Sequence, residues 1–113
     1  MTVSEMIQAL PLAVAAASGG LGAEVKGGYT SDLLSNVMGF SAPGSVWVTM
    51  QGHQNVIAVA SLSGLAAVIV AGGVAPEAEA IRKAETEKIT LLTSELPSFE
   101  LVGRLYQLGV TGV

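Results

Sequence analysis

The stretch that decides the fold is residues 46–73, which read VWVTMQGHQNVIAVASLSGLAAVIVAGG. Its two apolar runs, 46–50 and 66–70, have the length of strands, and the second run is continuous rather than alternating. Continuous apolar runs are typical of parallel strands that are buried on both faces. Residues 54–63, between the two runs, have a length ordinary for a helix. The stretch therefore predicts a strand–helix–strand unit.

The same alternation extends to both ends of the chain. Thr2 and Glu5 have the spacing of a capping box, which predicts a short first helix that ends before Pro11. A later helix is expected to begin with Ser31 or Asp32 as its cap and to end with Gly39 as the residue that follows it. The other elements expected are strands at 12–17, 24–29 and 89–93, and helices at 76–88 and 97–108.

Glycines at positions 19, 20 and 22 permit positive φ angles, so they predict a hairpin-like turn between the first two strands. Together the elements predict an α/β fold, a single layered sheet of about five strands, mostly parallel, with flanking helices. The sheet is expected to start with a β-hairpin and to continue as βα repeats with right-handed crossovers. A chain of 113 residues can build one hydrophobic core, so we expect 1–113 to form a single domain.

Composition and charge exclude several classes of protein. Half of the residues are hydrophobic and only 12% are charged, which excludes a disordered chain. The net charge of −4 provides no basic patch, so we expect no nucleic-acid partner. The absence of cysteine excludes disulfides and thiol chemistry and fits a reducing cytoplasm. The N-terminus has no basic region of a signal peptide, and we therefore expect a cytoplasmic protein.

No charged residue occurs between Asp32 and Glu77, and residues 56–75 are long enough to span a bilayer. Ser61, Ser63 and Gly64 interrupt this run in its middle, so we expect a helix and a strand of a globular domain and no membrane span. The helix at 54–63 has apolar side chains in most directions and needs cover on nearly all sides. A domain of this size cannot easily supply that cover, which predicts a homo-oligomer, in its simplest form a homodimer.

Polar and glycine residues follow several of the expected strands. Carboxyl ends of parallel strands gather at one edge of the sheet, where ligands of α/β proteins commonly bind. Several of these turns also open helices, whose free N–H groups favour an anionic group. The simpler alternative is that these residues only cap helices and turn the chain. The predicted ligand-binding residues are Thr30, Ser31, Asp32, Gln51, His53, Gln54, Asn55, Gly72, Gly73, Thr93 and Ser94.

The sequence contains no recognisable catalytic set. His53 is the single histidine, and no nucleophile or carboxylate pair accompanies it in sequence, so we expect no enzyme. A metal site would need Asp32 or Glu95 beside His53, and we expect neither a metal nor another cofactor. The glycines at 19, 20 and 22 match neither a P-loop nor a dinucleotide-binding fingerprint.

Four segments resemble the DRTGG domain family, and the resemblance extends over nearly the whole chain. They are GGYTSDLL at 27–34, VWVTMQGHQN at 46–55, AVIVAGG at 67–73 and FELVGRLY at 99–106. The resemblance implies a regulatory module, similar to the N-terminal domain of HPr kinase and to the regulatory module of phosphotransacetylases; some free-standing members accompany iron-only hydrogenases. The kinase activity belongs to a separate P-loop domain that this chain lacks.

The chain departs from the family at its name-giving motif. His53 and Gln54 stand where the family has Asp-Arg, and Ala71 stands before the glycine pair in place of threonine. A ligand that depends on the Asp-Arg pair would be lost or changed here.

Two functions follow as hypotheses. The first is a non-catalytic regulatory or sensor module, homodimeric, that binds a small anionic or nucleotide-like ligand at the C-terminal edge of the sheet. The alternative is a structural protein-interaction domain without a small-molecule ligand, with a protein partner such as a hydrogenase system.

Overall fold

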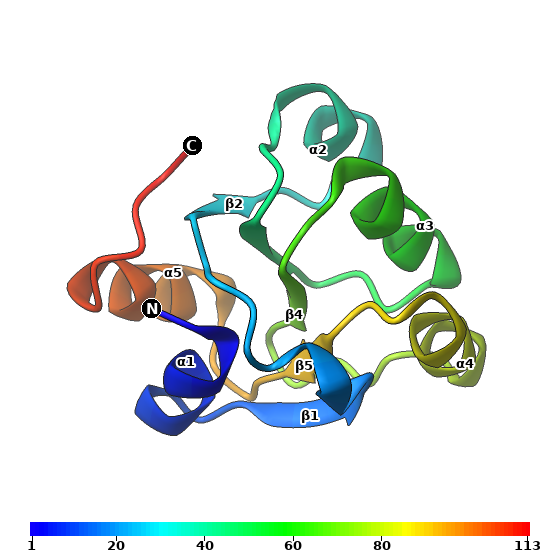
Figure 1. The fold of residues 1–113 in the computed structure, drawn as a ribbon, viewed down its shortest axis with the longest axis horizontal. Helices are drawn as coiled ribbons and strands as arrows, with labels where there is room; N and C mark the ends of the chain where they lie inside the picture. Colours follow the sequence, from blue (N-terminus) through cyan, green and yellow to red (C-terminus); the bar gives the residue numbers. More distant parts are fainter.

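The fold is a five-stranded sheet with helices on both faces, seen in a computed structural model that describes residues 1–113 (Figure 1). The strands lie in the order β1-β5-β4-β3-β2, and only β1 runs antiparallel to its neighbour. The strands are β1 (Ala13–Ala16), β2 (Gly27–Thr30), β3 (Ser45–Thr49), β4 (Ala67–Val70) and β5 (Leu91–Thr93). The helices are α1 (Val3–Ala9), α2 (Leu34–Phe40), α3 (Gln54–Ser63), α4 (Ala78–Glu87) and α5 (Ser98–Gln107), with a short 3-10 helix η1 (Ser18–Gly20). The predicted α/β class is confirmed.

Two layers of helices enclose the sheet. Figure 1 shows α1 and α5 on one side and α2, α3 and α4 on the other. Every residue of β3 and β4 is buried, as the continuous apolar run of the sequence predicts. Val46, Val48 and Ile69 pack toward α1 and α5, while Trp47 and Val68 pack toward the other three helices.

Helix α3 has the predicted bounds and is covered by its own chain. It packs against α2, α4 and strand β4, and only its last turn leaves a large apolar side chain open, Leu62 at 77% exposure. The apolar character of this helix therefore does not require a second copy of the chain. No helix in the structure combines the length and the apolar content needed to cross a bilayer.

The predicted β-hairpin at the start of the sheet is wrong. Strands β1 and β2 form opposite edges, and β1 pairs with β5 while β2 pairs with β3. Residues 17–26 connect them; fully extended they would reach about 33 Å, and the four strand spacings to be crossed amount to about 19 Å. The connection lies against the start of α1, where the Ser4 N–H donates to the Leu21 carbonyl. Its glycines have no positive φ; Gly20 instead allows a close approach to Thr90.

The predicted boundaries of α2 are also wrong. Leu33, not Ser31 or Asp32, is the residue before the first helical turn, and no side chain caps it. Gly39 lies inside the helix, which ends at Phe40 with Ser41 as its C-cap. The Asp32 side chain does not cap the helix, because it accepts hydrogen bonds from the end of β3 instead.

The predicted capping box of α1 is present, and the pKa of Glu5 tests it. The Thr2 N–H, at 2.8 Å, and the Thr2 hydroxyl, at 3.2 Å, donate to the Glu5 carboxylate and hold the pKa of Glu5 below its ordinary value of 4.5. Since the folded-state pKa is the lower one, the stabilisation exists above the ordinary pKa and is lost as the pH falls through the folded-state pKa.

We expect Thr2→Ala to raise the pKa of Glu5 toward its ordinary value, because the hydroxyl that donates to the carboxylate is removed. An NMR titration of the Glu5 carboxyl group measures this, and Ser4→Ala in the same turn is the control, expected to leave the pKa unchanged. An unchanged pKa in Thr2→Ala would contradict this account of the cap.

Candidate functional site

Asp32 connects the carboxyl ends of β2 and β3. Its Oδ1 accepts a hydrogen bond from the Thr49 hydroxyl at 2.7 Å and one from the Met50 N–H at 2.8 Å. The side chain of Gln51 donates back to the Asp32 carbonyl. Two of the predicted ligand-binding residues, Asp32 and Gln51, therefore hydrogen-bond the chain itself and fix the geometry of this edge.

Other predicted residues also form local hydrogen bonds. His53 caps α3, because its Nδ1 accepts from the Asn55 N–H at 3.0 Å, and Gln54 is the first residue of that helix. The Ser31 hydroxyl accepts from the Leu33 N–H at 3.1 Å. For these residues the simpler alternative of the sequence, helix caps and turns, describes the local geometry.

The Gly72–Gly73 turn follows β4 with positive φ angles of 73° and 72°. The Gly72 N–H donates to the Leu96 carbonyl at 2.8 Å, and the Gly73 N–H donates to the Ser94 carbonyl at 2.9 Å. The Ser94 hydroxyl donates to the Pro11 carbonyl at 3.1 Å and accepts from the Leu96 N–H. Both glycine amides are thus engaged within the chain and do not face an incoming anion.

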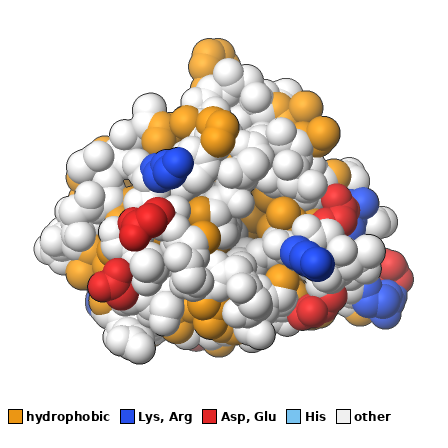
Figure 2. Space-filling view, viewed as in Figure 1, with side chains coloured by type: hydrophobic (Ala, Val, Ile, Leu, Met, Phe, Trp, Pro, Cys, Tyr) orange, Lys and Arg blue, Asp and Glu red, His pale blue; other side chains and the backbone are white.

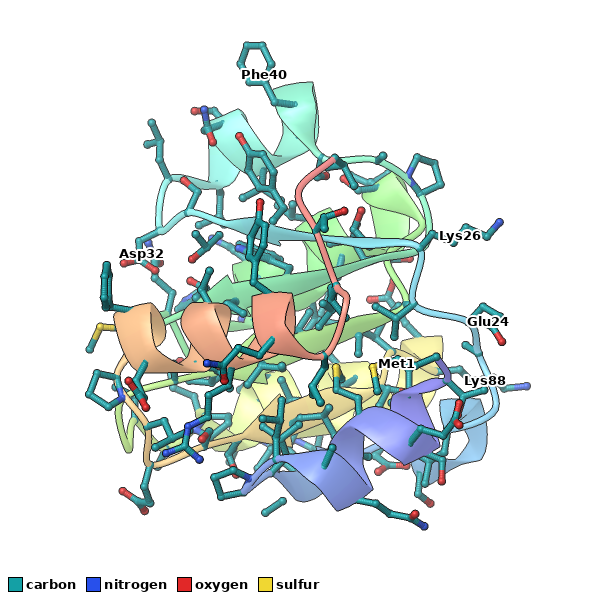
Figure 3. All side chains as sticks on the ribbon, turned by 90° about the vertical axis from the view of Figure 1, so that its left-hand side faces the viewer. Met1, Glu24, Lys26, Asp32, Phe40 and Lys88 are labelled. Carbon is teal, nitrogen blue, oxygen red and sulfur yellow. The ribbon has the colours of Figure 1, made fainter.

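The carboxyl edge of the sheet is acidic. Asp32 follows β2, Glu95 follows β5, and Glu79 and Glu100 occupy the first turns of α4 and α5. Arg82 and Arg104 pair with the last two of these carboxylates. Figure 3 places Asp32 at one end of the molecule and Lys26 and Lys88 at the opposite end. An anionic ligand at this edge, as the sequence predicts, would meet the carboxylates of Asp32 and Glu95, since the two arginines are already paired with Glu79 and Glu100.

The edge pocket, of about 500 Å³, opens beside the carboxyl ends of β4 and β5. It includes three predicted residues, Gly73, Thr93 and Ser94. A Cβ on Gly73 would lie 2.5 Å from Glu95 Oε2, so the carboxylate lies directly over the turn. The Thr93 side chain is half-buried and the Glu95 side chain is exposed, so both polar groups face the solvent-filled pocket, while no buried side-chain polar atom of the chain lacks a hydrogen-bond partner. The other lining residues are Pro11, Leu12, Ala13, Val74, Ala75 and Pro76.

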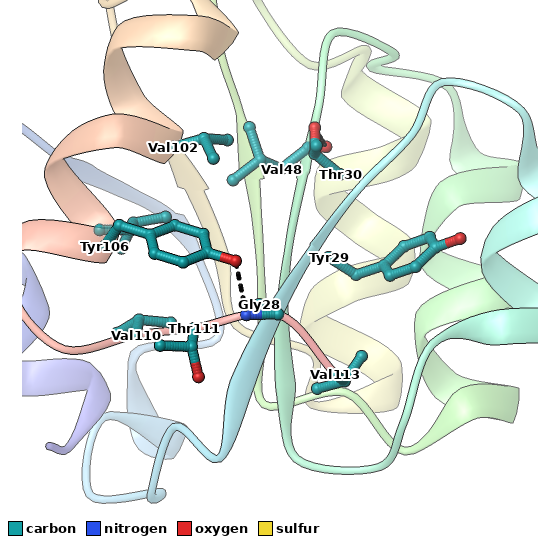
Figure 4. Close-up of a pocket in the computed structure, with 11 residues that line it drawn as sticks. Gly28, Tyr29, Thr30, Val48, Val102, Tyr106, Val110, Thr111 and Val113 are labelled. Atoms are coloured by element: carbon teal, nitrogen blue, oxygen red, sulfur yellow. Dashed lines mark hydrogen bonds between the residues drawn. The ribbon is translucent and has the colours of Figure 1, made fainter.

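The strap pocket, of about 320 Å³, lies between β2, α5 and residues 110–113, which we call the strap (Figure 4). Of the predicted residues it includes only Thr30. Its other lining residues are Gly28, Tyr29, Val48, Val102, Leu105, Tyr106, Val110, Thr111, Gly112 and Val113. The sequence did not predict this pocket, because no pattern in it indicates that residues 110–113 lie beside β2. The one available signal was the glycine pair at 27–28, since glycine inside a strand often marks a close approach of another backbone.

Of the eleven predicted residues, three line the edge pocket, one lines the strap pocket and seven line neither, and the two pockets have no lining residue in common. No cluster of three or more histidine, cysteine or acidic residues able to hold a metal ion occurs in the chain.

Comparison with protein-family models and with curated proteins finds no match. Among solved structures, the fold is similar to the crystal structure of the CBS and DRTGG domains of the regulatory region of Clostridium perfringens pyrophosphatase, complexed with its activator diadenosine tetraphosphate. The identity is 16%, the TM-score is 0.69, and the match covers 90% of this chain and 44% of that chain. This chain therefore spans less than half the length of that structure, and the two share a fold.

Substitution of Asp32 tests its role at the edge. We expect Asp32→Ala to lower the free energy of unfolding by about 2 kcal/mol, because the buried Thr49 hydroxyl and the Met50 N–H lose their acceptor. Asp32→Asn retains an oxygen at the same place and is expected to keep most of the stability in urea unfolding. Equal destabilisation by both substitutions would show that the charge, not the acceptor, matters.

Proposed function

We propose that the protein is a non-catalytic regulatory module of the DRTGG type that binds a nucleoside-like ligand in the edge pocket. The observation that carries the proposal is the pair of accessible polar groups in one pocket, the Thr93 hydroxyl and the Glu95 carboxylate over the Gly73 turn, at the carboxyl edge of a parallel sheet. The fold shared with a regulatory region that is complexed with a nucleotide activator supports the same function.

The chemistry of the edge pocket favours the nucleoside part of a nucleotide over its phosphates. A carboxylate accepts hydrogen bonds from ribose hydroxyls, which is the use of the acidic residue in dinucleotide-binding folds. Leu12, Val74 and Pro76 provide apolar wall for a base, and no lysine, arginine or histidine lines the pocket. Phosphates attached to such a ligand would remain in solvent, away from Glu95.

We propose no catalytic role because the polar side chains that could act in catalysis are engaged in hydrogen bonds that hold the fold. His53 caps α3 through Nδ1, and Asp32 connects β2 with β3, so neither lies free beside a nucleophile. The edge pocket contains one carboxylate, whereas acid–base chemistry commonly uses a pair of titrating groups. A sensor needs only a change of stability or shape when the ligand binds.

Titration with adenosine, followed in amide NMR spectra, tests the site. We expect the signals of Gly73, Val74 and Thr93 to shift, and AMP to bind no more tightly than adenosine. Glu95→Gln is expected to weaken binding about tenfold or more, because a charged acceptor for the ribose is lost.

Glu87→Gln is the matched control, since it removes the same charge from α4 outside the pocket and is expected to leave the affinity unchanged. Tighter binding of AMP than of adenosine, or shifts confined to other residues, would contradict recognition through hydroxyl groups.

A protein-interaction role is the second candidate, and an exposed apolar surface on α2 and α3 favours it. Met38, Phe40 and Leu62 are 54%, 70% and 77% exposed on these two neighbouring helices. Figure 2 shows apolar side chains and no charged ones at the top of the molecule, where α2 lies, and Figure 3 shows Phe40 projecting there. A homodimer through this surface would bury the three side chains.

Sedimentation velocity tests the homodimer. We expect the dimer of the unchanged chain to dissociate in the variant Phe40→Ser with Leu62→Ser, because the apolar contact is removed. Phe99→Ser, which alters a side chain that is 93% exposed in another helix, is the control and is expected to remain dimeric. If the chain without substitutions is monomeric at all concentrations, the homodimer is contradicted.

A further inference from the structure

Gly28 of β2 lines the floor of the strap pocket. Gly28 has no positive φ, and the nearest atom to a Cβ built there is Val110 Cγ1 at 3.4 Å, an ordinary contact. Neither backbone conformation nor crowding therefore demands glycine at this position. Gly27 differs, since a Cβ there would lie 2.4 Å from Val113 Cγ1. The glycine at 28 lets the strap approach the strand, since Thr111 O would lie 3.9 Å from a Cβ there, and a larger side chain would extend into the pocket that the strap borders.

The walls of the strap pocket determine the charge of what can enter. Val48, Val102, Leu105 and Val110 are apolar, and no acidic, basic or histidine side chain lines the pocket. An ion placed here would lose water without gaining a counter-ion. Tyr29, although it borders the space, points to the other face of the sheet, where its hydroxyl donates to Asn36 Oδ1 at 2.6 Å (Figure 4). The pocket therefore selects a neutral molecule.

Two hydroxyl groups supply the polar contacts. The Tyr106 oxygen accepts from the Gly112 N–H at 3.1 Å, dashed in Figure 4, and retains its own proton for an acceptor on a ligand. The Thr30 hydroxyl donates to the Val48 carbonyl at 2.9 Å, and its oxygen can still accept. One donor and one acceptor beside apolar walls complement a ring system that carries both an N–H and a carbonyl or ring nitrogen.

We propose that the strap pocket binds a small neutral heteroaromatic molecule and that the strap closes over it. The volume of about 320 Å³ is at the lower end of the range of roughly 300–1,000 Å³ for small-molecule sites, so a fused ring system fits, and the lack of a basic side chain disfavours a phosphate-bearing nucleotide. This site is separate from the edge pocket and goes beyond the function proposed above.

The strap makes the site responsive to its ligand. Three hydrogen bonds and the buried Val110 side chain hold it. The Val110 N–H donates to the Leu105 carbonyl at 2.9 Å, the Gly28 N–H donates to the Thr111 carbonyl at 2.8 Å, and the Gly112 N–H donates to the Tyr106 hydroxyl. Gly109, with a φ of 94°, lies between α5 and the strap and gives the backbone its turn. Because Thr111, Gly112 and Val113 line the pocket, a bound molecule fixes the strap, and its release leaves the strap with only these attachments.

The probe for this site is 2-quinolinone, a neutral fused ring with an N–H and a carbonyl, titrated into the full chain and followed in amide NMR spectra. We expect shifts at Gly28, Thr30 and Gly112 and slower hydrogen exchange of the Gly28 and Gly112 amides. Quinoline-2-carboxylate, which has the same ring system and a negative charge, is expected not to bind.

Gly28→Val fills the floor and is expected to abolish binding, while Gly22→Val, at an exposed glycine with nothing within 4 Å, is the matched control and keeps it. Tyr106→Phe retains the ring and is expected to weaken binding about tenfold, which keeps the test decisive if Gly28→Val does not fold.

Absence of shifts with 2-quinolinone, equal binding of the carboxylate, or undiminished binding in both Gly28→Val and Tyr106→Phe overturns the proposal. Shifts at Gly73 and Thr93 instead of Gly28 and Gly112 also overturn it. Adenosine binding in the edge pocket is read from different residues, so failure at one site leaves the other result intact.

Discussion

Burial of β3 and β4 on both faces is the constraint on which the rest of the structure depends. Neither strand offers a polar face to water, so each side of the sheet must be covered by helices. Parallel strands joined through such helices bring their carboxyl ends to one edge, and this fixes where turns such as 50–53 and 71–73 lie. Asp32 then determines how closely the turns after β2 and β3 approach each other.

The sequence predicts the repeating part of the fold well and its edges poorly. Helix α3 and the buried strands follow from local apolar patterns, which depend on neighbouring residues alone. The partner of β1 depends on a connection that crosses the whole sheet, and glycines that permit a hairpin do not require one. Likewise, the predicted site residues cluster at one edge, but hydrogen bonds among them, as between Asp32 and Thr49, become visible only in three dimensions.

The two pockets differ in the chemistry that they exclude. Helices α4 and α5 begin at the carboxyl edge, but their first turns already hold Glu79 and Glu100, each paired with an arginine of the same helix, while Asp32 and Glu95 add negative charge nearby. No charged side chain lines the strap pocket, so an ion there would lose water without gaining a counter-ion. The net charge of −4 therefore does not by itself indicate which ligands bind, because the positions of the carboxylates decide the charge at each pocket.

The strap also affects whether the edge strand β2 can pair with a further strand. Strand β2 is an edge strand, and Gly28 would present an unpaired N–H to solvent if Thr111 did not accept from it. The opposite edge is protected differently, since β1 is short and its pairing is irregular between Val14 and Ala16. Displacement of the strap would thus leave the Gly28 N–H without its acceptor at the edge of β2, where the strand of another molecule could pair with it.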